Sequence, residues 1–299
     1  MIKVCTLCPR NCAVDRKNGE KGICGQTSEL KVARAALHFW EEPCISGTTG
    51  SGTVFFSGCS LHCVFCQNES IANGTVGKHI TIERLAEIFF ELEKQGANNI
   101  NLVTPGHFIP QIREALLLAK KQGLTLPIVY NTSSYENVEA LKSLDGLIEI
   151  YLPDFKYMSS ELSAKYSHAA DYAKVAKAAI AEMVRQTGTP VFDENGEDGL
   201  IKRGTIVRHL TLPGCMEDSK EILKYLHDTY GEQIYISIMN QFTPLENVAA
   251  YPELNRKITE EEYEELIDYA IDLGVEQGFI QEGETAEESF IPAFDGEGV

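Results

Sequence analysis

The chain has 299 residues, of which 43% are hydrophobic and 23% are charged, the composition of an ordinary folded protein with a sizeable core. Its formal net charge of −18 argues against tight, non-specific nucleic-acid binding, which depends on Lys and Arg, so we expect no nucleic-acid partner, although the net charge leaves room for a local basic patch. No apolar stretch approaches the roughly 20 residues of a membrane span, and the first residues lack the apolar run of a secretory signal, so we expect a cytoplasmic protein without a membrane partner.

The first 50 residues differ from the rest of the chain. They contain Cys5, Cys8, Cys12 and Cys24 with the spacing C-x2-C-x3-C-x11-C, among Pro and Gly residues that favour turns. Such a segment is too short to build its own core. We therefore predict a small metal-binding module over residues 1–50, with a strand or short helix at 30–40, and a second, larger domain over residues 51–299.

From residue 53 onward, strand patterns alternate with helix patterns. Six apolar segments rich in β-branched and aromatic residues predict strands at 53–57, 99–104, 126–130, 147–152, 205–210 and 234–239. Segments with helical periodicity predict helices at 81–95, 110–122, 136–143, 159–187, 218–230 and 259–274, and residues 193–199 predict a turn. Thr81 can cap the first of these helices, and Thr259 with Glu262 forms a capping-box pattern at the start of the last.

Strands separated by helices are typical of parallel βα units, and these strands lack strict apolar–polar alternation, as expected when helices cover a parallel sheet. Six units are fewer than the eight of a closed TIM barrel. We favour an α/β fold that is an open, six-stranded partial barrel. A flat doubly wound sheet has the same spacing. In both folds ligands bind at the C-terminal ends of the strands.

Directly after the first predicted strand comes GCSLHCVFCQN, in which Cys59, Cys63 and Cys66 have the spacing C-x3-C-x2-C. A zinc knuckle would pair two C-x2-C motifs, and a plant-type ferredoxin would have C-x4-C-x2-C and a fourth cysteine. Three thiolates on a 4Fe–4S cluster leave one iron without a protein ligand, and a small-molecule cofactor can bind there. We predict this site at these three residues.

This motif, on the loop after the first barrel strand, resembles that of the radical S-adenosylmethionine (SAM) superfamily. The resemblance implies that SAM binds the open iron. It also implies that an electron, from a low-potential donor such as flavodoxin or ferredoxin, cleaves SAM to methionine and a 5′-deoxyadenosyl radical. That radical abstracts hydrogen from the substrate under anaerobic conditions. Phe65 matches the aromatic position that the family places against the adenine.

Further segments resemble the activating enzymes of pyruvate formate-lyase and other glycyl-radical enzymes, in particular a branch with four N-terminal cysteines. The matching segments are CTLCPRNC, EEPCISGTTGSG, NLVTPGH, YNTSSYE, YLPDFKY, VRHLTLPG and ISIMNQFTP. The resemblance implies that Asp154 and Lys156 contact the ribose and carboxylate of SAM. It places further side chains in the same pocket, namely Asn131, Ser133, Arg208, His209 and Gln241, with Met239 either beside Gln241 or in the core.

The hydrogen donor implied by this resemblance is a glycine of a partner protein. A peptide or small metabolite is an alternative substrate, and a non-catalytic iron–sulfur electron-transfer or carrier protein is an alternative of another class. The chain departs from the family at Val103-Thr104-Pro105-Gly106-His107, where many members carry Gly-Gly-Glu to bind the methionine amino group.

The remaining cysteines and acids have several interpretations. Four thiolates at Cys5, Cys8, Cys12 and Cys24 suit zinc, which we favour, or a second iron–sulfur cluster, whereas disulfides do not suit a reducing compartment. Cys44 and Cys215 are expected to be small buried side chains, although Cys215 follows a strand end where a thiol could face substrate. We expect His38, Glu41 and Glu42 to lie either on the solvated surface or facing the active site.

Overall fold

The computed structural model describes residues 4–193, 199–281 and 292–299, and within these ranges one ten-stranded sheet organises the chain. Six parallel strands follow one another across it, namely β2 (Ser51–Phe56), β4 (Ile100–Val103), β5 (Ile128–Thr132), β6 (Ile150–Pro153), β8 (Ile201–Leu210) and β9 (Tyr235–Met239). The sheet ends at β10 and β3 and does not close within the described residues. This confirms the open partial barrel.

The edges of the sheet extend it beyond the six predicted strands. On one side β1 (Lys31–His38) pairs antiparallel with β2, and β3 (Lys78–His79) pairs with β1. On the other side β10 (Gly278–Ile280), which we did not predict, pairs parallel with β9. The short strand β7 (Val191–Phe192) pairs with β8, and residues 194–198 of the predicted turn between them lie outside the described residues. Residues 31–38 are therefore part of the same sheet as the strands that follow.

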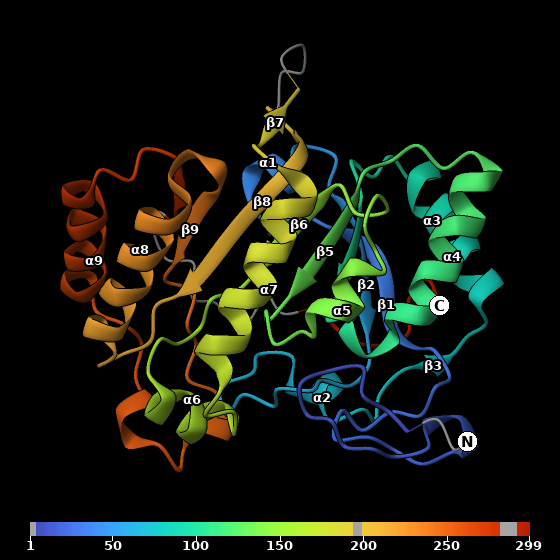
Figure 1. Cartoon of the computed structure of the whole chain (residues 1–299), viewed down its shortest axis with the longest axis horizontal. Coiled ribbons are helices and arrows are strands. Elements are labelled where there is room, and N and C mark those ends of the chain that lie inside the picture. Colours follow the sequence, from blue (N-terminus) through green and yellow to red (C-terminus); the bar gives the residue numbers. More distant parts are fainter. Residues whose placement is uncertain (1–3, 194–198, 282–291) are drawn as a thin grey trace.

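Helices cover the outer face of the sheet (Figure 1). They are α3 (Ile82–Lys94), α4 (Ile109–Gln122), α5 (Val138–Lys142), α7 (Tyr172–Thr187), α8 (Met216–Tyr230) and α9 (Glu260–Leu273). The caps form as predicted: the Thr81 hydroxyl accepts from the Arg84 amide, and Thr259 and Glu262 make a complete capping box. Outward apolar side chains of the strands pack against these helices in two large clusters, which form the core.

The single helix predicted over 159–187 is wrong. The segment forms α6 (Ser160–Ser167) and α7, separated at His168, whose left-handed φ of 51° ends α6. Apolar and small residues suited to helix continue through the break, but the cap at His168 turns the chain. Single-turn 3-10 helices occupy Arg16–Asn18, Gly106–Phe108, Gly231–Gln233, Glu246–Val248 and Pro252–Leu254. Searched over the described residues, the helices include none that is both long and apolar enough to cross a bilayer.

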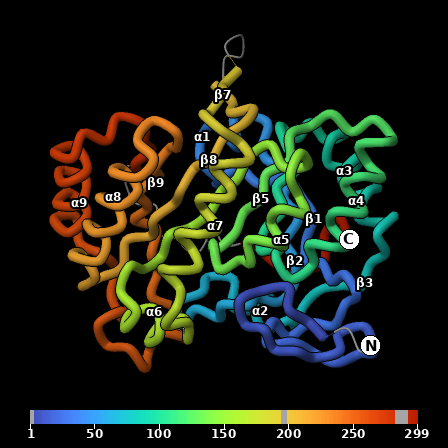
Figure 2. The backbone as a smooth tube through the Cα atoms, in the orientation of Figure 1, coloured from blue at the N-terminus to red at the C-terminus, as the bar shows by residue number. Residues whose placement is uncertain are grey.

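At the end where the parallel strands begin, apolar side chains pack against the inner face of the sheet. There α1 (Pro43–Ser46) brings Cys44 and Ile45 against inward side chains of the strands, including Val129, Ile150 and Ile206. At the opposite end, where the strands finish, lie the N-terminal segment, α2 (Glu69–Ala72) and α6 (Figures 1 and 2). The apolar packing of α1 therefore leaves the C-terminal ends of the strands as the place for a polar site.

Candidate active site

A cavity of about 230 Å³ opens at the C-terminal ends of the central strands. All three cysteines of the C-x3-C-x2-C motif line it. Seven of the eight residues predicted to contact SAM line it as well, namely Phe65, Asn131, Ser133, Asp154, Lys156, Arg208 and Gln241. Met239 also contributes to the wall. Side chains at or just after the ends of β5, β6, β8 and β9, and on the loop after β2, thus meet where a partial barrel places its ligands.

The loop between β2 and α2, residues 57–68 (the cluster loop), carries the three cysteines. Its second residue, Gly58, has a φ of 91°, and a Cβ atom there would overlap the backbone oxygen of Cys24, so the position requires glycine. Two sulfurs already accept hydrogen bonds: Cys59 Sγ from the Leu61 amide at 3.4 Å and Cys63 Sγ from the Ser167 hydroxyl at 3.0 Å. Donors of this kind stabilise thiolate ligands.

The three thiols fit a 4Fe–4S cluster by their chemistry and by their shared cavity. Burial raises the pKa of Cys63 to about 11, against the opposing charge of Lys156, and burial also raises the pKa of Cys66. Such thiols ionise only when a cation replaces the proton. No three His, Cys, Asp or Glu side chains in the described part of the chain already converge on one metal position. The fit therefore rests on the donor set and its placement on one cavity wall.

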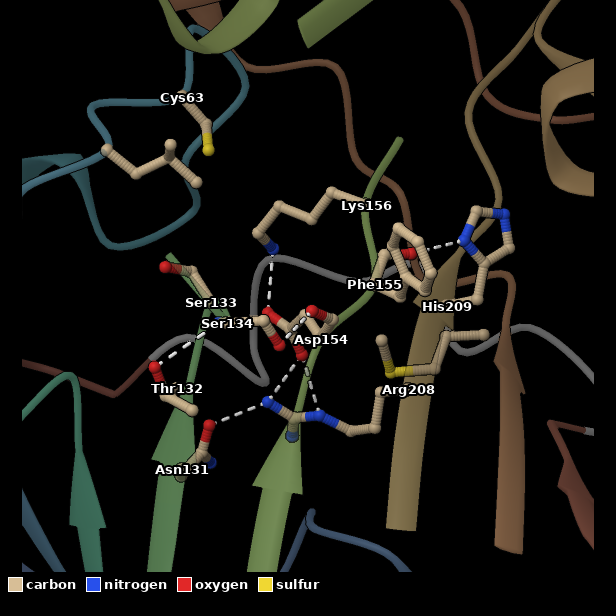
Figure 3. A network of polar contacts seen from close by, with 12 residues as sticks. Cys63, Asn131, Thr132, Ser133, Ser134, Asp154, Phe155, Lys156, Arg208 and His209 are labelled. Carbon is tan, nitrogen blue, oxygen red and sulfur yellow. Dashed lines mark hydrogen bonds and ion pairs between the residues drawn. The ribbon is translucent and has the colours of Figure 1, made fainter. Parts of the chain in front are cut away.

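Beside the cysteines lies a network of charged side chains centred on Asp154 (Figure 3). One carboxylate oxygen accepts from Lys156 Nζ at 2.7 Å and the other from Arg208 Nε at 2.9 Å. Burial alone would raise the pKa of Asp154, but the charges of Arg208 and Lys156 outweigh it and lower that pKa. Burial likewise opposes the charge of Lys156, and Asp154 outweighs it, so its pKa is raised. All three side chains are therefore charged inside the cavity.

The chain segment between β1 and α1 supplies a further member of this network. Glu41 accepts from Arg208 Nη1 at 2.9 Å and from the side-chain amides of Asn101 and Asn131 at 3.1 and 3.2 Å. Its side chain is only 8% exposed. From the sequence, Glu41 was expected to lie either on the solvated surface or facing the active site. No local signal in the sequence could have decided, because its partner Arg208 lies 167 positions away.

Glu42 is buried next to this network. Burial raises its pKa, although the charge of Arg208 opposes the shift, and its Oε2 atom has no hydrogen-bond partner among the described residues. In the loop after β4, where many members of the family carry Gly-Gly-Glu, the side chain that lines the cavity is that of Thr104, which has a left-handed φ of 56°. Among the described residues the carboxylates in the cavity wall are those of Glu41 and Asp154.

The expectation that His209 lines the pocket is wrong. Successive residues of a strand point to opposite faces, so Arg208 turns inward and His209 outward (Figure 3). The ring nitrogens of His209 bond the Phe155 carbonyl and the Ser219 hydroxyl, each at 2.8 Å. Burial lowers the pKa of His209 to about 4, so the ring is neutral. Cys215, at the start of α8, is also absent from the cavity wall.

The four N-terminal cysteines lie together outside this cavity. A Cβ atom added at Gly22 would lie 3.3 Å from Cys12 Sγ and 3.4 Å from Cys24 Sγ, so these two sulfurs are neighbours. Burial raises the pKa of Cys8 to about 12, and Cys24 and Cys5 contribute to the rise. Four thiols that influence one another are a suitable donor set for tetrahedral zinc or a fully ligated cluster.

Comparisons with known proteins bear on the cysteine loop and on the fold. The family profile of the radical SAM superfamily matches residues 53–199, which begin in β2 and contain Cys59, Cys63 and Cys66. An uncharacterized protein of Methanocaldococcus jannaschii is 26% identical over 277 residues, which are 90% of this chain and 75% of that protein.

Two solved structures share the fold at low sequence identity. Streptococcus suis SuiB bound to the precursor peptide SuiA has a TM-score of 0.51 and 13% identity over 75% of this chain. Methylornithine synthase (PylB) has a TM-score of 0.51 and 15% identity over 74% of this chain. The matches span 46% of the SuiB chain and 60% of the PylB chain. The solved structures share the open βα sheet, and the profile match, which covers the three-cysteine loop, identifies residues 53–199 as a domain of the radical SAM superfamily.

Proposed function

We propose that this protein is a radical SAM enzyme that abstracts hydrogen from its substrate after reductive cleavage of SAM. Membership of the superfamily implies a 4Fe–4S cluster and SAM. The observation that carries the proposal is that the three cysteines and the charged network of Asp154, Lys156 and Arg208 line the same cavity. When bound, the cluster and SAM supply an electron and a 5′-deoxyadenosyl radical, chemistry that no side chain provides.

In this proposal each side chain has a role that follows from its contacts. Cys59, Cys63 and Cys66 hold the cluster, and Phe65 packs against the adenine. Lys156 binds the methionine carboxylate, because among the described residues its ammonium donates to Asp154 alone, at 2.7 Å. Asp154 accepts from the ribose hydroxyls.

Arg208 has a different role because its donors are already engaged. Its Nε, Nη1 and Nη2 atoms donate to Asp154, Glu41 and Asn131. A guanidinium whose three nitrogens all donate to side chains orients those acceptors and has few N–H groups left to bind a ligand. We therefore assign Arg208 the positioning of Asp154 and Asn131. Gln241 and Ser133 complete the wall.

For the substrate we propose a glycine of a partner protein, as in the glycyl-radical activating enzymes. A peptide or a small metabolite is the second candidate for the same chemistry. We further propose a cytoplasmic location, anaerobic operation and a low-potential donor such as flavodoxin or ferredoxin, since the cluster requires an electron. At Cys5, Cys8, Cys12 and Cys24 we propose zinc in preference to a second cluster, because a fully ligated structural site needs no open position.

The class of reaction can be tested by anaerobic iron reconstitution, reduction with dithionite and addition of SAM. The parent should form 5′-deoxyadenosine, and Cys63→Ala should form none while retaining the metal of the N-terminal site. Cys215→Ala is the matched control, because this thiol does not line the cavity. A parent that holds iron but forms no 5′-deoxyadenosine would favour the electron carrier. A Cys63→Ala variant as active as the parent would refute the cluster assignment.

The hydrogen donor can be identified by deuterium transfer. Extract from cells grown on [2,2-²H]glycine is separated into protein and small-molecule fractions, and each is added to the reduced enzyme with SAM. Deuterated 5′-deoxyadenosine from the protein fraction alone would support glycine of a partner protein. Deuterium from the small-molecule fraction alone would favour a metabolite.

A further inference from the structure

The N-terminal cysteine segment contacts the cluster loop through one arginine. Arg10 donates from Nε to the Ser60 carbonyl at 2.8 Å and from Nη2 to the Leu61 carbonyl at 3.2 Å. The same side chain donates from Nη1 to the His168 carbonyl at 2.5 Å and from Nη2 to the Ser167 carbonyl at 3.0 Å. Its planar fork of donors therefore joins two segments that lie more than 100 residues apart in sequence.

These two segments, the cluster loop and the end of α6, also contact each other directly. The Ser167 hydroxyl donates to Cys63 Sγ at 3.0 Å, and the Val64 amide donates to the Tyr166 carbonyl at 2.8 Å. Ser167 and His168 are at the C-terminal end of α6, where carbonyls lack helical partners and the helix dipole favours a cation. Arg10 thus holds the end of α6 against the loop that carries Cys63.

The position of Arg10 is itself constrained from two sides. It lies between Cys8 and Cys12, in a tight turn closed by the Asn11 amide and the Cys8 carbonyl at 3.1 Å, with Asn11 at a left-handed φ of 41°. Its guanidinium stacks over the Tyr135 ring, 5.1 Å from the centroid, on the loop after β5. A fixed backbone and a stacked guanidinium together leave the side chain little rotational freedom.

We propose that Arg10 is a positioning residue for the cluster: it fixes the cluster loop against the end of α6 and so sets the environment of the cluster held by Cys59, Cys63 and Cys66. The N-terminal cysteine segment is then a clamp on the active site. This inference rests on the proposed cluster, and it assigns to Arg10 a role that acts through the loop.

The test compares Arg10→Gln and Arg10→Lys with the parent, all reconstituted anaerobically with iron. Arg113→Gln is the matched control, because Arg113 also donates to a carbonyl at a helix end, that of Ser143 at 3.0 Å, but on the outer helix layer. We expect Arg10→Gln to speed amide hydrogen exchange in residues 58–66 by at least about tenfold. Its reduced cluster should also show an altered electron paramagnetic resonance spectrum and faster iron loss. Arg10→Lys should recover part of both effects, because an ammonium can reach some but not all of the four carbonyls.

Each result has a definite meaning. Faster exchange with an altered spectrum, in Arg10→Gln but not in Arg113→Gln, supports the proposal. Unchanged exchange overturns it, and so does faster exchange with an unaltered spectrum and unaltered iron retention, since Arg10 would then stabilise the fold only. If the parent itself binds no iron at the three cysteines, the proposed function fails. This outcome differs from a parent that holds the cluster and an Arg10→Gln variant that behaves like it, which overturns only the role of Arg10.

Discussion

Glu41 offers a sharp test of the charged network, because all of its hydrogen-bond partners among the described residues are donors. It accepts from Arg208 Nη1, from Asn131 Nδ2 and from Asn101 Nδ2. Glu41→Gln keeps the shape but removes the charge, and it turns an amide N–H toward neighbours that also donate. Losing the charge-assisted bond to Arg208 costs about 1.5–3 kcal/mol. Breaking a fully buried pair costs about 3–5 kcal/mol, but Arg208 keeps Asp154 as a partner, so we expect a loss of about 2–3 kcal/mol.

The assay is urea unfolding under anaerobic conditions, with variants compared at equal metal content and equal slope of free energy against urea. The matched control is Glu87→Gln, whose carboxylate is 67% exposed and lies 3.5 Å from Arg84, and which should change stability by less than about 0.5 kcal/mol. Because Glu41 also orients Arg208, SAM should bind more weakly to Glu41→Gln. A Glu41→Gln variant as stable as the control would refute the view that Glu41 is a buried partner of Arg208.

Two further predictions concern Lys156 and His209. Lys156→Met keeps the apolar stem and removes the ammonium, so the affinity for SAM should fall roughly ten- to a hundredfold, a loss of about 1.5–3 kcal/mol of binding free energy, while the iron content stays normal. Titration of SAM into the reduced protein, followed by electron paramagnetic resonance, measures this affinity. An unchanged affinity would remove Lys156 from the SAM site. His209 has a folded pKa of about 4, below the ordinary value of about 6.5, so its contribution to stability is present above pH 6.5 and is lost as the pH falls. Between pH 7 and pH 5 the parent should therefore lose about 2 kcal/mol more than His209→Gln, as measured by urea unfolding at each pH, and equal losses would show that His209 is not held neutral.

Local signals in the sequence predicted most of the secondary structure and the proposed cluster ligands. Apolar runs and caps such as Thr81 and Thr259 act within a few residues, so six of the parallel strands and most helices could be predicted. The cysteine spacing C-x3-C-x2-C is likewise local, and it indicated both the cluster and the family. The exceptions were the break at His168 and short elements of two to four residues, namely α1, α2, β3, β7 and β10, for which the sequence provides only a weak signal.

Only the tertiary structure decided which polar side chains share the cavity. Glu41 reaches Arg208 across 167 positions of sequence, and no local pattern shows that the segment after β1 enters the barrel. The inward or outward direction of Arg208 and His209 depends on the register of β8 with β6 and β9, which pairing between distant strands sets. The clamp by Arg10 needs three remote segments to meet, because its guanidinium finds carbonyl acceptors only where folding leaves helix and loop ends unpaired.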